Sequence, residues 1–232
     1  MAGQVSKRAG AGAMAKRLDF GERVFIIGGG PSALGAPFEL MAQHGHVMAV
    51  NDSFLHCPAN SVVSMDGRWM SHRIESVLDK GLPFYGSLKH FSKWMKELAY
   101  RDGLHLFSVD PKPEGMSENA HPVFGNCSGN FAVNLAYLAR PKEIYLFGFD
   151  SCLHPEQVGK AEHWYGNYPW RPERKGWGHM LNWARWHDQA RMQFDRAGIK
   201  VFNVSKISNI RAYERMSLGQ FQNHFRELSK SQ

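Results

Sequence analysis

A glycine-rich turn after a short apolar run constrains the fold of this chain more than any other stretch. The run is Arg-Val-Phe-Ile-Ile at 23–27, and the next five residues are Gly28, Gly29, Gly30, Pro31 and Ser32. A short β-branched and aromatic run predicts a strand buried in a parallel sheet. Glycines let the backbone approach a ligand, and proline suits a first helical turn. We therefore predict a strand that turns into a helix whose N-terminal amides face an anion.

The glycine turn leaves two interpretations open, a nucleotide site or only a tight strand-to-helix turn. The stretch is not the dinucleotide fingerprint, because Ala33 stands where that motif has its third glycine, and it lacks the Gly-Lys-Ser/Thr of a P-loop. The turn alone is therefore weak evidence for a nucleotide.

The rest of the chain continues the alternation of strand and helix. Strands are predicted at 46–50, 61–66, 81–86, 104–109, 142–150 and 199–205, and helices at 34–44 (interrupted by Pro37), from Met70, after 130 and at 180–197. This order predicts an α/β, Rossmann-like fold with a mostly parallel sheet flanked by helices and an aromatic and basic lid insertion. We divide the chain into a flexible basic tail (1–20), a nucleotide-binding catalytic domain (21–212, lid at 151–178) and a C-terminal helix (213–232).

Composition narrows the class of protein and partner. The net charge of +7 favours anionic partners, although it could serve solubility alone. No run approaches 18 apolar residues, so we expect no membrane span. The three cysteines lack the spacing of metal ligands and cannot all pair, which favours a reducing cytoplasm. We predict no metal site, because His154 and His163 have no clear third and fourth ligands.

Polar residues follow several predicted strands, at the edge where open α/β sheets bind ligands. Asn51 and Asp52 could contact a ribose or base, or form an Asx turn or helix cap. Asp66 could hold a metal–phosphate complex or a substrate hydroxyl, or cap the next helix, and Arg68 could neutralise phosphate. Asp150 is a third carboxylate at a strand end. Three such placements favour a binding edge.

Two further stretches carry candidate ligand contacts. Asn126, Ser128 and Gly129 precede an apolar helix, where free amides and hydroxyls suit an oxyanion or nucleotide. The segment 151–178 interleaves aromatic and basic residues, which suits stacking on a base or sugar beside a phosphate, unless it forms a small core of its own. Its candidate contacts are His163, Tyr165, Tyr168, Arg171, Arg174 and Lys175.

The order of these motifs, with Lys-Glu-Ile-Tyr-Leu-Phe-Gly-Phe-Asp at 142–150 and Gly-His before a long helix, resembles a known group of proteins. The chain resembles bacterial lipooligosaccharide sialyltransferases and pterin-pyrophosphokinase-like domains over residues 23–212, and phage proteins of the "norphogenetic" type more closely still. Its first motif departs from those sialyltransferases, which carry an Asn among the glycines, and its lid is richer in Trp and Arg.

The resemblance implies a modified Rossmann domain that binds a nucleotide sugar under a lid. It implies nucleotide contacts by 28–32 and Asn51, and a donor site lined by Asn126, Ser128 and Gly129. His179 falls at the position of a general base, and Tyr165 and Tyr168 match tyrosines that steady the leaving phosphate. In the pyrophosphokinase relatives, carboxylates matching Asp66 and Asp150 hold magnesium.

Three functions follow as hypotheses. The first is a phage-type, nucleotide-sugar-dependent glycosyltransferase acting on DNA that carries a modified base. Its predicted catalytic residues are His179, Asp150, Tyr165 and Tyr168, with Arg171, Arg174 and Lys175 against the departing phosphate. A histidine titrates near neutrality and can take a proton from an attacking hydroxyl, although His179 could equally cap or stack. The alternatives are a magnesium-dependent pyrophosphokinase or phosphotransferase, and a nucleic-acid-binding phage accessory protein.

Overall fold

The computed structural model describes residues 18–91, 93–152, 163–170 and 179–230. Within these ranges eight strands form one sheet in the order β10-β9-β8-β1-β2-β3-β4-β5, and all neighbouring strands are parallel. The strands are β1 (Arg23–Ile27), β2 (His46–Val50), β3 (Ser61–Ser64), β4 (Phe84–Ser87), β5 (Leu104–Phe107), β8 (Glu143–Phe147), β9 (Lys200–Val204) and β10 (Glu214–Arg215). The predicted α/β fold with a mostly parallel sheet is confirmed.

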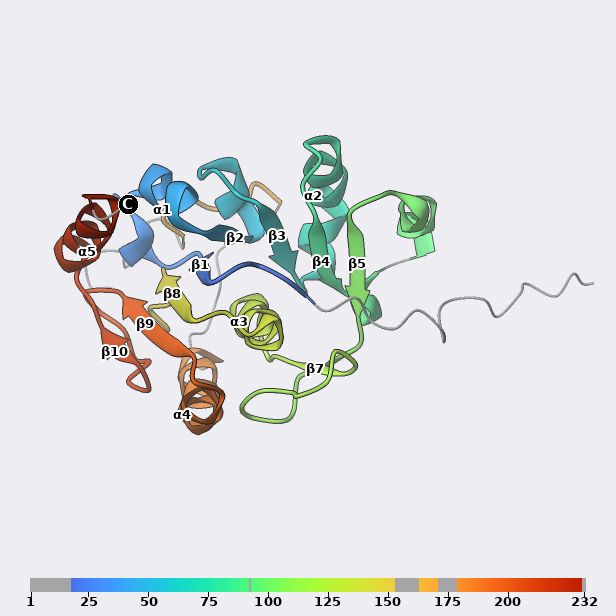
Figure 1. Cartoon of the computed structure of the whole chain (residues 1–232). Helices are drawn as coiled ribbons and strands as arrows, with labels where there is room; N and C mark the ends of the chain where they lie inside the picture. The colour runs from blue at the N-terminus through green and yellow to red at the C-terminus, as the bar shows by residue number, and fades with distance from the viewer. Residues whose placement is uncertain (1–17, 92, 153–162, 171–178, 231–232) are drawn as a thin grey trace, which may run out of the picture.

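Helices cover both faces of this sheet (Figure 1). The α-helices are α1 (Phe38–His44), α2 (Gly67–Asp79), α3 (Ser128–Ala139), α4 (His179–Ala197) and α5 (Leu218–Lys230). Short 3₁₀ helices are η1 (Pro31–Ala33), η2 (Asn51–Leu55), η3 (Leu88–His90) and η4 (Lys93–Tyr100). The core clusters place α3 and α4 on one face and α1, α2 and α5 on the other.

The apolar run of β1 is continuous because both of its faces are buried. Val24 and Ile26 pack in the core beneath α3 and α4, whereas Phe25 and Ile27 pack against α1 and α5. Side chains alternate along a strand, so a strand covered on both faces needs apolar residues at every position. This arrangement explains why the sequence signal of β1 was strong.

The order in which strands are added to the sheet reverses at β1. Strands β2 to β5 extend to one side of β1, while β8, β9 and β10 extend to the other. The loops that leave the carboxyl ends of β1 and β8 therefore separate at one point, and such a switch point is the usual ligand crevice of an open α/β sheet. We call the side of the sheet where the strands end the carboxyl edge.

Three predicted elements differ in the structure. Of the helix expected at 34–44, only α1 (Phe38–His44) forms, because proline at 37 disfavours helical backbone in the residue before it; η1 precedes this range. The helix expected from Met70 begins at Gly67. The C-terminal part expected as a separate helix also supplies β10, which pairs with β9, and α5 buries Phe221 and Phe225 in the common core.

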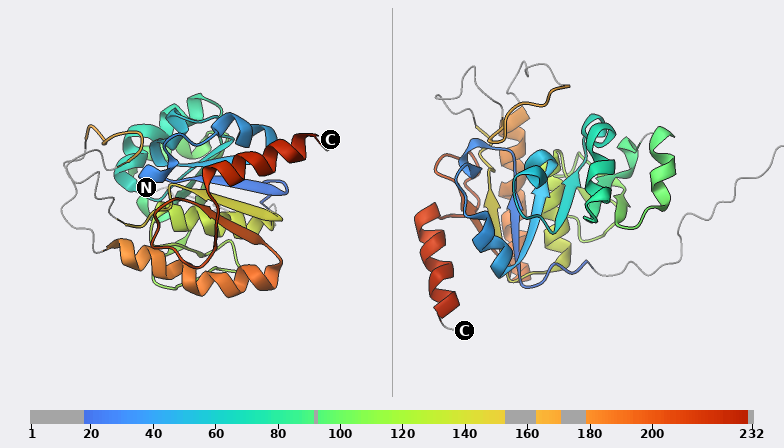
Figure 2. Two further views of the ribbon diagram at one scale, coloured as in Figure 1. Left: turned by 90° about the vertical axis from the view of Figure 1, so that its left-hand side faces the viewer. Right: turned by 90° about the horizontal axis from the view of Figure 1, so that it is seen from above.

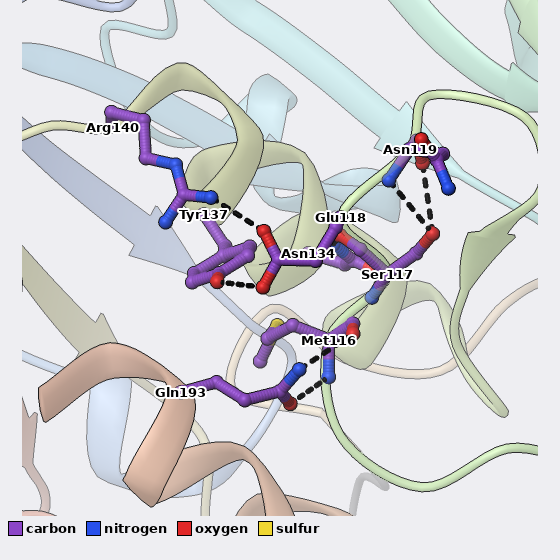
Figure 3. A network of polar contacts seen from close by, with 8 residues as sticks. All are labelled: Met116, Ser117, Glu118, Asn119, Asn134, Tyr137, Arg140 and Gln193. Carbon is purple, nitrogen blue, oxygen red and sulfur yellow. Dashed lines mark hydrogen bonds and ion pairs between the residues drawn. The ribbon is translucent and has the colours of Figure 1, made fainter. Parts of the chain in front are cut away.

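A loop that the sequence leaves without structure is attached to the helices on one face. It connects β6 (Val109–Asp110) to β7 (Val123–Phe124), which form a separate two-stranded sheet. Figure 3 shows how side chains from α3 and α4 hold its backbone and Glu118. Asn134 accepts hydrogen bonds from the amides of Ser117 and Phe124, both at 2.9 Å, and Gln193 binds Met116 through both groups of its amide. The loop is therefore anchored to both helices by hydrogen bonds.

A search of the described residues for a helix long and apolar enough to span a membrane finds none.

Candidate functional site at the carboxyl edge

The glycine turn after β1 packs backbone against backbone on the turn after β8. Gly28 N donates to Phe147 O at 2.7 Å, and Gly30 N donates to Gly148 O at 2.9 Å. A Cβ added to Gly30 would lie 2.5 Å from Gly148 O, and Gly148 itself has a φ of +67°. Glycine is required here because any side chain would separate the two loops.

The anion that faces the amides of the glycine turn belongs to the protein. The Asp150 carboxylate accepts hydrogen bonds from Ser32 N at 2.9 Å and from Ser32 Oγ, and Ser205 Oγ donates to it at 2.8 Å. Asp150 is only 2% exposed. This carboxylate joins the loops that follow β1, β8 and β9. Asp150 therefore occupies the Ser32 amide and holds the turn, and the nucleotide contacts expected at 28–32 stay predictions.

Residues 163–170, which we call the covering segment, lie across the carboxyl edge (Figure 2). Trp164 N donates to Gly29 O at 3.1 Å, and its indole Nε1 donates to Gly28 O at 3.0 Å. A Cβ on Gly29 would meet His163 Nδ1 at 2.6 Å. Because glycine has no side chain, the covering segment can pack directly on the backbone at Gly29.

Asn51 is the most unusual residue beneath the covering segment. Its φ is +54°, in the left-handed region that non-glycine residues rarely occupy. Its Oδ1 is buried and has no hydrogen-bond partner among the described residues. Burial raises the pKa of the nearby Tyr168 phenol. Tyr168 and Tyr165 are joined through their hydroxyls at 3.0 Å. Tyr168 remains protonated at neutral pH and can donate.

Asp52, the neighbour of Asn51, is committed to protein contacts. Its carboxylate accepts from Trp69 Nε1 at 2.8 Å and from Arg73 through Nε at 3.1 Å and Nη2 at 3.2 Å. Asp52 is 5% exposed. These contacts, which are neither the Asx turn nor the helix cap considered from the sequence, use both carboxylate oxygens. A ribose contact by Asp52 stays a prediction.

Asp66 adopts the capping alternative. It is the N-cap of α2 and accepts from the amides of Arg68 at 2.9 Å and Trp69 at 3.2 Å. Arg68 is exposed on the first turn of α2. Asp66 and Asp150 are thus bound to amides and serines, and in the described part of the chain no three His, Cys, Asp or Glu residues are grouped to hold a metal. Magnesium binding by Asp66 and Asp150 stays a prediction.

The starts of α3 and α4 meet on the other side of the edge. Ser128 Oγ accepts from Met65 N at 3.1 Å, which ties α3 to the end of β3. Asn126 donates to Asn182 O at 3.4 Å, and Asn130 donates to Trp183 O at 3.2 Å. A Cβ on Gly129 would lie 3.1 Å from the Phe149 ring.

The predicted site residues therefore form two groups. His179 begins α4, is exposed, and makes no hydrogen bond or ion pair with the residues that the structure describes. It belongs to the group at the starts of α3 and α4, whereas Asn51, His163, Tyr165 and Tyr168 belong to the group under the covering segment. The predicted contacts at Arg171, Arg174 and Lys175 lie outside the described residues.

Sequence reasoning missed the aromatic and basic side chains that hold the covering segment. Trp69, His72 and Arg73 come from α2, and the His56 ring stacks on Tyr165 with centroids 5.8 Å apart. The only available signal was the three- and four-residue spacing on α2, which places Trp69, His72 and Arg73 on one side of the helix.

Comparisons with known proteins give a weak fold likeness and nothing else. No family model and no curated protein matches the chain. Among solved structures, the sialyltransferase CstII from Campylobacter jejuni with the substrate analogue CMP-3FNeuAc is 14% identical, with a TM-score of 0.46 over 84% of this chain and 86% of that chain. CstII with a trisaccharide acceptor and CMP is 13% identical, with a TM-score of 0.48 over 84% and 86%.

The monofunctional alpha-2,3-sialyltransferase Cst-I from the same organism is 10% identical, with a TM-score of 0.44 over 91% of this chain and 96% of that chain. Similarity at this level does not transfer an activity or a site from one protein to another. The function of this chain therefore has to be inferred from its own geometry.

Proposed function

We propose that the chain is a nucleotide-sugar-dependent glycosyltransferase that binds its donor at the carboxyl edge, beneath the covering segment. The observation that carries this proposal is Asn51, a non-glycine residue with a φ of +54° whose buried Oδ1 has no partner among the described residues. Left-handed backbone and an unpaired buried acceptor both destabilise the folded state, and residues with such strain cluster at ligand sites. A donor N–H or O–H from a base or ribose would satisfy this oxygen.

The two tyrosines of the covering segment suit the leaving phosphate. Burial raises the pKa of Tyr168, so its hydroxyl stays a donor at neutral pH. A hydroxyl that donates to a phosphate oxygen stabilises the negative charge that develops as the sugar departs. The Tyr165 hydroxyl lies 3.0 Å from the Tyr168 hydroxyl, so the two form a hydrogen-bonded pair. We assign both residues to the leaving group.

His179 is the proposed general base. The acceptor oxygen forms a bond to the anomeric carbon, the bond from that carbon to the phosphate oxygen breaks, and the acceptor proton passes to the imidazole. Its exposed position at the start of α4 leaves the ring open to an acceptor. The net charge of +7 supports an anionic acceptor, and DNA with a hydroxymethylated base is the acceptor that the phage resemblance implies.

The experiment is a titration of the full chain with nucleotides. Binding is measured by calorimetry and by thermal denaturation, each with and without EDTA. The panel contains CMP, UMP, GMP and AMP, the matching diphosphates, and representative nucleotide sugars, so that no donor is chosen in advance. We expect one nucleotide to bind without metal and to raise the melting temperature, because a ligand of the folded state stabilises it by mass action. Absence of binding across the panel would contradict the proposal.

The matched variants are Asn51→Gly and Asn223→Ala. Glycine relieves the left-handed strain and removes the unpaired oxygen, so we expect Asn51→Gly to be as stable as the wild type or more stable by about 1 kcal/mol. We also expect it to bind the nucleotide about tenfold more weakly, the loss of one hydrogen bond. Asn223 is exposed on α5, and its variant should change neither property. A loss of stability in Asn51→Gly would mark Asn51 as structural.

A further inference from the structure

The carboxyl end of the covering segment is held by a single aromatic residue. Trp170 stacks on His72 with ring centroids 4.3 Å apart and on Tyr168 at 5.3 Å, with interplanar angles of 18° and 15°. The Arg73 guanidinium lies 4.8 Å from the centroid of the Trp170 ring. Stacked rings and a cation over an indole attract each other beyond their burial. Trp170 is therefore bound to α2 by its ring faces.

Arg73 is itself fixed in place by Asp52. The guanidinium makes a two-point contact with the Asp52 carboxylate at 3.1 and 3.2 Å, and Trp69 Nε1 supplies a third hydrogen bond at 2.8 Å. The Asp52 side chain is 7% exposed and that of Arg73 is 27% exposed, so solvent screens this pair only in part. A two-point contact holds the plane of the guanidinium, and the plane determines how the group lies on the indole.

We propose that Asp52, Arg73 and Trp170 form a latch that holds the covering segment closed, and that Arg73 is a positioning residue for Tyr168. The contacts form a continuous path from Asp52 to Arg73, to Trp170 and to Tyr168. If the chain binds a nucleotide under this segment, the latch would also slow nucleotide release. That consequence rests on the proposed function, whereas the latch itself rests on contacts within the chain.

The latch is tested first by amide hydrogen exchange on the ligand-free protein. The Trp164 amide, bonded to Gly29 O, reports closure of the covering segment, and the Gly166 amide, bonded to His163 O, reports the turn within the segment. In Trp170→Ala we expect exchange across 163–170 to be about tenfold faster, with β1 unchanged. Trp170→Phe keeps a stacking ring and should restore most of the protection. Unchanged exchange in Trp170→Ala, or equal exchange in both variants, overturns the latch.

Arg73→Lys tests the positioning role without leaving the Asp52 carboxylate unpaired. Lysine keeps the charge but cannot contact both carboxylate oxygens while lying flat on the ring, so we expect exchange across 163–170 to rise severalfold. The control is Arg101→Ala, which removes the ion pair that Arg101 makes with Asp79 at the end of α2, at 2.8 Å, and should leave 163–170 unchanged. Wild-type exchange in Arg73→Lys excludes the positioning role.

Nucleotide dissociation separates the latch from the proposed function. For the nucleotide that binds best, we expect the dissociation rate to rise about tenfold in Trp170→Ala and to return toward the wild type in Trp170→Phe. If no nucleotide binds, the proposed function fails and the exchange measurement still decides the latch. If a nucleotide binds and its dissociation is equal in all three proteins, the latch does not control release.

Discussion

Gly30 and Gly219 are two glycines whose surroundings predict opposite effects of an added methyl group. A Cβ on Gly30 would lie 2.5 Å from Gly148 O and 2.7 Å from Asp150 Oδ2, whereas a Cβ on Gly219 meets nothing within 4 Å. We expect Gly30→Ala to lower the free energy of unfolding by about 1–3 kcal/mol, because rigid backbone must move.

Gly219 lies in α5, where alanine favours helix by up to about 1 kcal/mol. Gly219→Ala should therefore be neutral or stabilising. Urea unfolding of both variants measures the contrast. Equal stability of the two would mean that the loops after β1 and β8 can separate without cost, and the glycine turn would then need a ligand to explain it.

At the scale of elements, α3 and the loop before β7 form one unit through Asn134. This residue is fully buried and donates through Nδ2 to Ser117 O at 3.1 Å, in addition to accepting from Ser117 N and Phe124 N. Asn134→Ala leaves these backbone groups without partners, and we expect a loss of about 1–3 kcal/mol for each group that stays buried.

Gln189→Ala is the matched control for Asn134→Ala, since Gln189 is exposed on α4, four residues before Gln193. Urea unfolding gives the change in stability, and hydrogen exchange of 115–124 locates it. A change in Asn134→Ala no larger than that of the control would show that the loop can re-pair its amides with water.

For the whole molecule, buried neutral histidines predict a loss of stability in acid. Burial lowers the pKa of His187, which is bonded to the Tyr213 hydroxyl at 3.0 Å, to about 3, and the pKa of His46 to about 4. An unfolded histidine titrates near 6.5, so the unfolded state takes up protons first as the pH falls. This contribution is complete above about pH 6.5 and is lost progressively between there and the folded pKa values.

Each of these histidines should lower the free energy of unfolding by about 1.4 kcal/mol per pH unit below 6.5. Urea unfolding at pH 7.5 and at pH 5 measures the slope. The double variant His46→Gln, His187→Gln carries no imidazole at these positions and should show a shallower slope over the same range. An unchanged slope would assign acid sensitivity to other groups.

The sequence alone determined the parallel sheet and the edge at which a site is expected. Strands buried on both faces require continuous apolar runs, which can be recognised in the sequence. The Gly, Asn and Asp residues that follow these runs indicate the edge of the sheet at which ligands bind. The boundaries were less certain, since prolines and caps such as Pro37 and Asp66 moved helix starts by a few residues.

Only the tertiary structure decided what each polar residue does. Ser32 and Asp150 are 118 positions apart, and Asp52 meets Arg73 from another element, so no local pattern could assign their partners. A carboxylate at a strand end satisfies either a ligand or the protein's own amides, and the choice depends on which loops the sheet order brings together. For Asp150, Asp52 and Asp66 the protein's own donors occupy the carboxylate, whereas Asn51 keeps an acceptor that no described residue satisfies.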